Sequence, residues 1–357
     1  MPDVDGLEKL VLADLRDADA AAFQAQLASR NLEEALSRLR RIAALVEGDD
    51  RVDGLSRNDA TALDAEVCRL IVNHLGVERA NLKPALNFAA WTGRASYHLP
   101  LELFTVNYDL VLETALEALR VPYFDGFVGS LRSRFHTDLV ESTRSDQEAW
   151  LPRFLVRLWK LHGSVNWEWE QTGIPEIVRL GTPVRGASPA AIFPSDTKYQ
   201  ESRRVPFMVL QDRFRRALLE NETLVLVTGY SWQDEHLNEL LFDSLRRRPR
   251  SEVIAFCYSE IPDELAAHAA RTPNLQVTAP TEAVLSGVRR DWKAERPAPD
   301  DVWISDRFAL GDFAALATFL ARSSPVDGEL ERRLDGALRA LLADQSAPET
   351  GPGDTNE

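Results

Sequence analysis

The chain has 357 residues, of which 45% are hydrophobic and 27% charged, and this composition excludes a wholly disordered or a fibrous protein. At about 150 residues per domain, the length fits two domains or one large α/β domain with an appendage. With 41 Lys and Arg against 56 Asp and Glu, the formal net charge is −15, which disfavours direct binding of nucleic acid because phosphates carry the same sign. Helix N-termini and local arginines can still bind a free anionic ligand.

The cysteine count limits the metal and redox chemistry of the chain. Cys68 and Cys257 are far apart in sequence and too few for a disulfide framework or a four-thiolate zinc site. We therefore expect no zinc, and a reducing cytoplasm as the location. The sequence has no apolar run of about 18 residues and no basic region followed by an apolar core at its start, so it predicts neither a membrane span nor a secretory signal.

Residues 1–100 are expected to be mostly helical. Asn31 and Glu34 have the spacing of a capping box, and apolar residues then recur at helical spacing up to Val46. A second helix is expected to be capped by Asp59 and to end near Gly76. Neither helix carries residues with evident chemistry, which favours a packing role.

From residue 101 onward, short apolar runs alternate with helical patterns. Each predicted helix follows a predicted strand, and the strands are almost continuously apolar, so the pattern indicates a parallel sheet covered on both faces. The run Thr223–Thr228 is the strongest signal for a buried strand. The other expected elements are strands at 101–106, 157–161, 253–258 and 275–278, and helices at 109–119, 207–219, 232–245 and 262–271.

The remaining segments have weaker patterns. Residues 120–155 and 165–205 are rich in aromatic residues, Pro, Gly and Arg, and we expect irregular binding loops or lids there. Two helical patterns follow, at Asp312–Ala321 and Gly328–Leu342. We therefore divide the chain into a core at 1–290, made of a helical part (1–100) and an α/β part (101–290), a C-terminal helical appendage at 291–345, and a small, polar, disordered tail at 346–357.

Three predicted strands end in polar residues, and ligands of parallel sheets bind at the carboxyl ends of the strands. The first end is TVNYD, which holds Thr105, Asn107 and Asp109. The second is KLHGS, which holds His162, Gly163 and Ser164. The third is TGYSWQDEHLN, which holds Gly229, Ser231 and Asp234.

Each of these side chains also has a purely structural interpretation. Asp109 could cap the helix that follows it, and Ser231 with Asp234 could form another cap. Asn107 could hydrogen-bond a turn, and a single histidine after a strand, such as His162, is more often structural than catalytic. These side chains are stronger evidence for a functional site when the three strand ends are considered together.

Taken together, the segments resemble the sirtuin superfamily. TVNYD is similar to the Asn/Asp strand end of bacterial sirtuin-like NAD hydrolases, and KLHGS to the segment that holds the catalytic histidine of the superfamily. VTGYSWQDEHLNELL resembles the GYS-x-x-DEH-x-N segment of a defence branch whose members partner a hexameric HerA-type ATPase. IFPSDTKY, at 192–199, and Asn-Leu-Glu, at 31–33, are similar to further segments of the same branch. The resemblance covers roughly residues 5–260, and it implies a Rossmann-like parallel sheet of the sirtuin type with helical additions at both ends.

The resemblance also implies roles for individual residues. Asn107 would hold the nicotinamide ribose and the attacking water, and His162 would act as the general base. Gly229 and Ser231 would face the adenosine ribose or the phosphates, and Asp234 would order their turn. The remaining residues expected at the NAD site are Thr105, Asp109, Gly163 and Ser164.

The chemistry of NAD hydrolysis is consistent with these residue types. Cleavage of the N-glycosidic bond develops positive charge on the ribose, and nicotinamide leaves as a neutral molecule, so a strong acid is unnecessary. A positioned water, a base that titrates near neutrality and polar groups around the ribose are sufficient, and a histidine with an asparagine can provide them.

The sequence departs from the superfamily in two places. It has no C-x-x-C pair, so the zinc module of deacetylating sirtuins is not expected and deacetylation is disfavoured. It also has no Gly-Ala-Gly phosphate loop near its start, where Met1–Leu15 resembles the segment that follows that loop. We expect that the sequence starts just downstream of the loop, through truncation or a misplaced start codon. Without the loop, weak NAD binding and the lack of a first strand are expected.

We therefore predict an NAD hydrolase that depletes NAD in antiviral defence, controlled by assembly into a homo-oligomer and, through the defence-branch resemblance, by an ATPase ring. The alternative is a catalytically weak or inactive scaffold or sensor subunit of a defence complex; the missing loop favours it, and Asn107 with His162 argue against it. The sequence does not distinguish complete hydrolysis from cyclisation of the ADP-ribose product.

Overall fold

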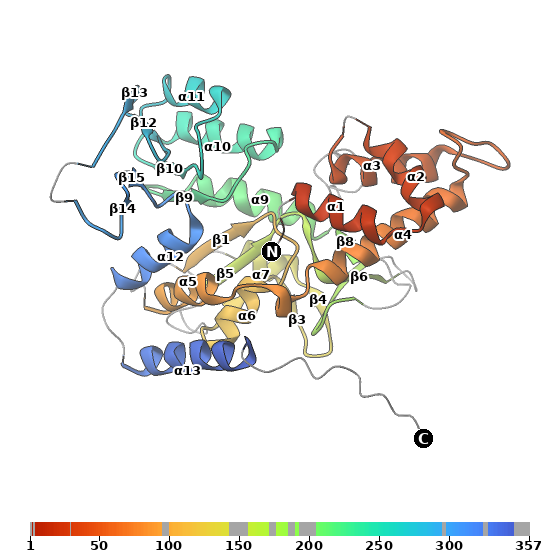
Figure 1. The fold of residues 1–357 in the computed structure, drawn as a ribbon, viewed down its shortest axis with the longest axis horizontal. Coiled ribbons are helices and arrows are strands. Elements are labelled where there is room, and N and C mark those ends of the chain that lie inside the picture. The colour runs from red at the N-terminus through yellow and green to blue at the C-terminus, as the bar shows by residue number, and fades with distance from the viewer. Residues whose placement is uncertain are drawn as a thin grey trace.

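The computed structural model combines helices with parallel and antiparallel sheets (Figure 1). Its described residues are 2, 4–28, 30–94, 100–142, 156–170, 176–184, 190–192, 205–294, 298–323 and 328–345. The segment 193–199, which contributed to the family resemblance, and the tail 346–357 lie outside these residues. Within them, no helix is both long enough and apolar enough to cross a membrane.

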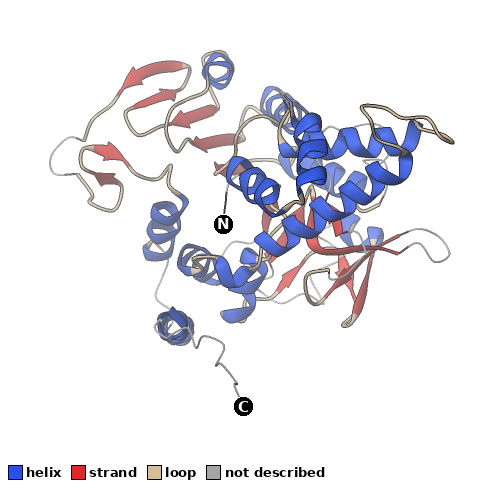
Figure 2. Ribbon diagram, turned by 45° about the vertical axis from the view of Figure 1, so that its right-hand side comes forward, coloured by secondary structure: helices blue, strands red, loops and turns tan. Residues whose placement is uncertain are grey.

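The N-terminal part is a helical bundle (Figure 2), whose apolar core also includes Val165 and Val184 from the antiparallel-sheet region. Its main helices are α1 (Val4–Asp14), α2 (Asp17–Leu27), α3 (Leu32–Leu45) and α4 (Arg57–His74). The predicted capping box is present, because the Asn31 side chain accepts from the Glu34 amide and the Glu34 side chain accepts from the Asn31 amide. The expected cap at Asp59 is wrong by three residues: Ser56 is the N-cap, and Asp59 is its reciprocal partner.

The second helix was displaced in the prediction because Asp is itself a good N-cap residue and immediately precedes the apolar pattern. After α4, the short helix η1 (Val77–Arg79) leads to α5 (Lys83–Arg94). Helix α5 lies under the first parallel sheet and brings the chain to its first strand.

The first sheet is parallel and has the order β1-β5-β2. It consists of β1 (Leu101–Thr105), β5 (Val156–Lys160) and β2 (Tyr123–Phe124). One face, with Leu103 and Leu158, packs on α5 and on α6 (Val111–Ala118). The opposite face, with Phe104 and Trp159, packs toward α9 (Phe207–Leu218). This arrangement confirms the predicted parallel sheet with helices on both faces.

Residues 120–155 and 165–205 contain regular structure that their composition did not predict. The described parts form an antiparallel sheet of order β3-β4-β7-β6-β8, and the short helix α7 (Thr137–Glu141) lies beside it. The strands are β3 (Phe127–Val128), β4 (Arg132–Phe135), β6 (Gly163–Glu170), β7 (Glu176–Leu180) and β8 (Ala190–Ile192). The expectation of irregular loops was wrong for these residues, because β6 alternates polar with aromatic side chains instead of forming an apolar run.

The second sheet has the order β13-β12-β11-β10-β9. It consists of β9 (Leu224–Thr228), β10 (Glu252–Phe256), β11 (Leu275–Thr278), β12 (Glu282–Leu285) and β13 (Val288–Asp291). The first three are parallel, and β12 and β13 form an antiparallel extension. Helices α10 (Glu235–Arg247) and α11 (Asp263–Ala269) connect the parallel strands, as the sequence pattern predicted.

The position of β9 differs from the prediction in one respect. Its apolar run was the strongest signal for a buried strand, yet among the described residues β9 is an edge strand, and 60% of Leu224 is exposed. An apolar run shows that both faces of a strand are covered, but it does not show whether a strand lies on each side. Strand β1 is likewise an edge strand among the described residues, and its neighbour β5 is buried throughout.

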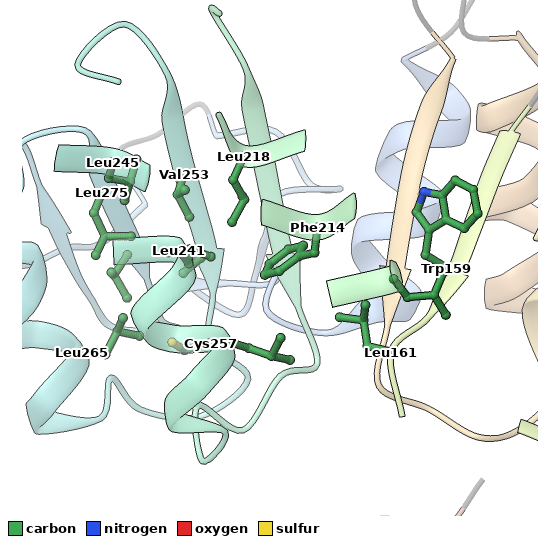
Figure 3. Packing of buried hydrophobic residues seen from close by; sticks show 14 of the residues in the cluster. Trp159, Leu161, Phe214, Leu218, Leu241, Leu245, Val253, Cys257, Leu265 and Leu275 are labelled. Atoms are coloured by element: carbon green, nitrogen blue, oxygen red, sulfur yellow. The ribbon is translucent and has the colours of Figure 1, made fainter. Parts of the chain in front are cut away.

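One apolar cluster connects the two sheets (Figure 3). Phe214 and Leu218 of α9 lie between the second sheet and the Trp159 and Leu161 side chains of the first sheet. The rings of Phe104 and Phe214 meet edge to face with centroids 5.0 Å apart. Helix α9 therefore holds the two sheets beside each other.

The C-terminal part adds the hairpin strands β14 (Trp303–Ile304) and β15 (Arg307–Phe308) and two helices. These helices, α12 (Phe313–Arg322) and α13 (Gly328–Gln345), agree with the two predicted helices. Both pack on α5: the Arg94 guanidinium donates to the Ala321 carbonyl at 2.9 Å, and Leu330 joins the cluster that contains α5. The proposed domain limits remain a prediction.

A charged group at the buried side of the first sheet ties three elements together. The Glu102 carboxylate of β1 accepts from Arg157 of β5 at 3.0 Å, from the Trp159 indole at 2.6 Å and from Arg213 of α9 at 3.0 Å. All of these side chains are mostly buried. Removing the carboxylate would leave two guanidinium groups without their partner, which costs more than losing an exposed ion pair.

We expect Glu102→Ala to lower the free energy of unfolding by about 3 kcal/mol, because it leaves buried charges uncompensated. The matched control is Glu66→Ala, which removes an exposed pair with Arg69 and should cost less than about 1 kcal/mol. Urea denaturation of both variants measures the difference. Equal midpoints for the two variants would show that the Glu102 group does not stabilise the fold.

Candidate functional site

The loop after β1 presents Asn107 at the carboxyl end of the strand. The Asn107 amide donates to the Thr105 hydroxyl at 3.1 Å, and the Asp109 carboxylate accepts from the Val111 amide at 2.9 Å in the first turn of α6. Thr105 and Asp109 thus shape the loop, and the Asn107 residue is exposed. The interpretation of Asp109 as the N-cap of α6 was wrong, because Leu110 is the N-cap and Asp109, one position before it, accepts from the Val111 amide.

A buried lysine supports the same loop from β5. The Lys160 ammonium donates to the Asp109 carbonyl and pairs with Glu113 of α6 at 2.9 Å. The sequence pattern indicated no role for Lys160. Its position next to an apolar strand run could have indicated a structural role, because a buried ammonium group requires partners.

The second strand end lies next to the first. Thr105 and Lys160 are register partners in β1 and β5, and Asn107 and His162 each follow these residues by two positions. The Leu161 amide donates to the Thr105 carbonyl at 2.9 Å, which extends the pairing to the turn. Asn107 and His162 therefore lie at the same end of adjacent strands.

Gly163 and Ser164 continue the chain from His162 into β6. Gly163 has a φ of 94°, a backbone conformation that glycine adopts without strain. Ser164 is fully buried, and its hydroxyl donates to the Tyr108 carbonyl at 3.3 Å. These two residues hold the turn of His162 against the loop of Asn107.

The structure pairs His162 with Asp234, a contact that sequence analysis did not predict. The His162 Nε2 atom lies 3.0 Å from an Asp234 oxygen, and the side chains are only 10% and 9% exposed. The other Asp234 oxygen accepts from the Leu237 amide at 3.1 Å, so Asp234 is also the N-cap of α10. This contact links the carboxyl ends of the first and second sheets.

The ionisation of Asp234 determines which nitrogen of His162 carries a proton. Burial alone would raise the pKa of Asp234, but the hydrogen bond and charge of His162 and the Leu237 amide outweigh burial and lower that pKa. An ionised carboxylate only accepts hydrogen bonds, so Nε2 of His162 is the donor. The Nδ1 atom then remains able to accept a proton.

The third strand end forms a turn with an open backbone. Gly229 has a φ of 63°, and a Cβ atom added there would meet nothing within 4 Å among the described residues. The hydroxyl of Thr228 is buried, and no described residue is its hydrogen-bond partner. Sequence analysis omitted Thr228 from the site, because a strand-terminal threonine has no distinguishing pattern. An open backbone beside an unpaired hydroxyl suits a polar ligand that approaches closely.

The rest of the turn is held by Tyr230 of the turn itself and by Asn238 of α10. The Tyr230 hydroxyl donates to the Asp234 carbonyl at 3.1 Å, and Asn238 donates to the Trp232 carbonyl at 2.8 Å. Ser231 lies exposed in this turn, and the prediction that it shares the helix cap with Asp234 was wrong, because Asp234 alone provides the cap side chain.

The nine predicted site residues therefore lie at three strand ends of the same α/β unit. Asn107 and His162 follow adjacent strands, and the contact of His162 with Asp234 joins them to the turn of Gly229 and Ser231. In the part of the chain that the structure describes, no group of three or more His, Cys, Asp or Glu residues could hold a metal ion. The polar groups present suit a nucleotide-like ligand with ribose hydroxyls.

A parallel α/β sheet with polar residues at the carboxyl ends of its strands defines a Rossmann-like, nucleotide-binding class of protein. Residues 101–278 match the family model of the SIR2-like domain, and this segment includes all three strand ends. The chain therefore belongs to the sirtuin-like superfamily. Among curated proteins, none matches the chain. A SIR2-like domain indicates an NAD-related role, as an enzyme or as a sensor.

The Asp234 contact predicts a pH-dependent stability. Because the pKa of Asp234 is lowered below its ordinary value of 3.8, the carboxylate stabilises the folded state above that pH. This stabilisation is lost as the pH falls through the folded-state pKa. We expect Asp234→Asn to be less stable than wild type at pH 7, with a difference that shrinks below about pH 4.

Chemical denaturation at several pH values measures this difference. The matched control is Asp243→Asn on the same helix, since the partners of Asp243 among the described residues are the exposed Arg246 and Arg247. A stability difference for Asp234→Asn that stays constant down to the acid limit of folding would contradict a charged His162–Asp234 contact.

Proposed function

We propose that the chain hydrolyses NAD to ADP-ribose and nicotinamide. The observation that carries the proposal is the position of Asn107 and His162 at the ends of adjacent strands, with His162 oriented by Asp234. A histidine held by a carboxylate through one nitrogen has its other nitrogen free for proton transfer. This arrangement is what activation of a water molecule requires.

In the proposed reaction, water attacks the anomeric carbon of the nicotinamide ribose. The bond from that carbon to the pyridinium nitrogen breaks, and its electron pair neutralises the ring, so nicotinamide leaves without a proton. The proton of the water passes to Nδ1 of His162, and Asp234 stabilises the positive charge that the imidazole gains. Asn107 orients the water and the ribose through its amide.

The remaining site residues would bind the ligand or hold the loops of the site in place. Gly229 and Ser231 would face the adenosine ribose or the phosphates, and the unpaired Thr228 hydroxyl adds a hydrogen-bonding group beside them. Thr105 and Asp109 hold the loop of Asn107, and Gly163 and Ser164 form the turn of His162. No zinc takes part in this proposal.

We further propose that the activity serves antiviral defence in the bacterial cytoplasm by depleting NAD. The support is the resemblance of the DEHLN segment, at 234–238, to the defence branch that partners a HerA-type ATPase. An unregulated NAD hydrolase would harm its own cell, so we propose control by homo-oligomeric assembly, with a hexameric ATPase as the candidate partner. The two free, buried cysteines are consistent with a reducing location.

Asn107→Ala and His162→Ala should each reduce NAD turnover by at least about 100-fold, because each removes a group that acts on the reacting atoms. Matched controls are Asn221→Ala and His136→Ala, which belong to none of the three strand ends of the candidate site and have exposed side chains. Chromatography of nicotinamide and ADP-ribose measures the loss, with and without an ATPase partner. Cyclic ADP-ribose in the product would indicate cyclisation instead of complete hydrolysis.

The same variants test the alternative of a scaffold or sensor subunit. Turnover that is absent from wild type in every condition, together with measurable NAD binding by calorimetry, would favour a sensor. Wild-type turnover that survives both the Asn107 and the His162 substitution would show that the reaction uses other groups.

A further inference from the structure

Tyr108, the residue after Asn107, extends from the candidate site into the N-terminal helical bundle. Its hydroxyl donates to the carboxylate of Glu33 at 2.5 Å. Glu33 lies in the first turn of α3, next to the capping box of Asn31 and Glu34. The Tyr108 ring packs against the apolar cluster of the bundle. The bundle therefore holds a side chain that is one peptide bond away from the candidate catalytic asparagine.

The backbone of Tyr108 is tied to the other half of the site. Its carbonyl accepts from the Val165 amide at 2.9 Å and from the Ser164 hydroxyl at 3.3 Å. Ser164 and Val165 follow His162 by two and three residues, and both are fully buried. Tyr108 thus connects the Asn107 loop, the turn of His162 and helix α3.

The environment of Tyr108 keeps its hydroxyl a donor. Burial is the main cause that raises its pKa well above the ordinary value, and the Glu33 charge adds to this effect. Arg40 and Cys68 also face the group, and Arg40 pairs with Asp64 at 2.9 Å. Glu33 therefore contributes the acceptor through which α3 holds the tyrosine.

We propose that Tyr108 is a positioning residue, and that the Glu33–Tyr108 hydrogen bond is how the N-terminal bundle sets the geometry of Asn107 and His162. The proposal rests on the proposed NAD hydrolysis for its kinetic test. The N-terminal helices, for which the sequence pattern indicated only a packing role, would then also contribute to the reaction. Displacement of α3 relative to the sheet would move the Asn107 loop, and displacements of about 1 Å in an active site are enough to slow a reaction 100-fold.

The kinetic test compares removal of the hydrogen bond with its conservative replacement. Tyr108→Phe keeps the ring in the apolar cluster and removes the donor, and Glu33→Ala removes the acceptor. We expect each to lower kcat for NAD about tenfold with a smaller change in KM, because ligand binding is retained and alignment is lost. Glu33→Gln retains an acceptor oxygen and should recover most of the lost kcat.

A second tyrosine–glutamate pair provides the matched control. The Tyr123 hydroxyl donates to Glu117 at 3.0 Å, away from the strand ends, so Tyr123→Phe should leave kcat unchanged. The double variant Tyr108→Phe/Glu33→Ala should be no slower than either single variant, because both remove the same contact.

Amide hydrogen exchange separates this proposal from the proposed function. Tyr108→Phe and Glu33→Ala should speed exchange at residues 106–110 and 163–166, and Tyr123→Phe should not. If neither wild type nor any variant turns NAD over, but amide exchange changes as expected, the proposed function fails and the positioning role of Tyr108 stands. If kcat and local exchange stay at wild-type values, or if exchange rises uniformly over the whole chain, Tyr108 is only a structural residue and the proposal is overturned.

Discussion

The contact between His162 and Asp234 is the constraint on which the site depends. His162 follows β5 of the first sheet and Asp234 follows β9 of the second sheet, so their hydrogen bond of 3.0 Å joins segments at the carboxyl ends of the two sheets. The same carboxylate caps α10, so the helix, the turn before it and the histidine share one acceptor group. Loss of this contact would leave the two sheets connected mainly by apolar packing on α9. The arrangement of the candidate site is therefore a consequence of tertiary pairing and not of any single segment.

Much of the fold follows from local patterns in the sequence. The helices at 32–45, 207–218 and 313–322 were predicted because their apolar spacing is helical, and at α3 the capping box favours the same element. The parallel strands at 156–160 and 252–256 were predicted from buried apolar runs. The antiparallel sheet between 127 and 192 was missed, because its strands are short and some alternate polar with aromatic residues. The edge position of β9 was missed because strand order is not encoded in a strand's own sequence.

The site was predicted in part for a general reason. Parallel strands bring their carboxyl ends to one edge, so polar residues after three such strands were expected to gather. The structure places Asn107 and His162 after adjacent strands and brings Asp234, from the other sheet's side, against His162. The pairing of His162 with Asp234 required knowledge of how two sheets lie relative to each other, which periodicity does not contain. Lys160 and Tyr108 were quoted within longer segments, but their partners Glu113 and Glu33 are distant in sequence. Their roles depend on contacts across the fold.

The edges of β1 and β9 have a consequence of their own. In the described part of the chain neither edge is paired on its outer side, and Figure 3, in the colours of Figure 1, shows the two edges facing each other. Each edge is a row of backbone donors and acceptors without the lysine or proline that commonly protects such a row. An extended polypeptide could add to either edge as a further strand, because each edge has backbone groups available for such pairing. A parallel strand added to β1 would end at the same edge of its sheet as Asn107, and one added to β9 would end at the same edge as Gly229.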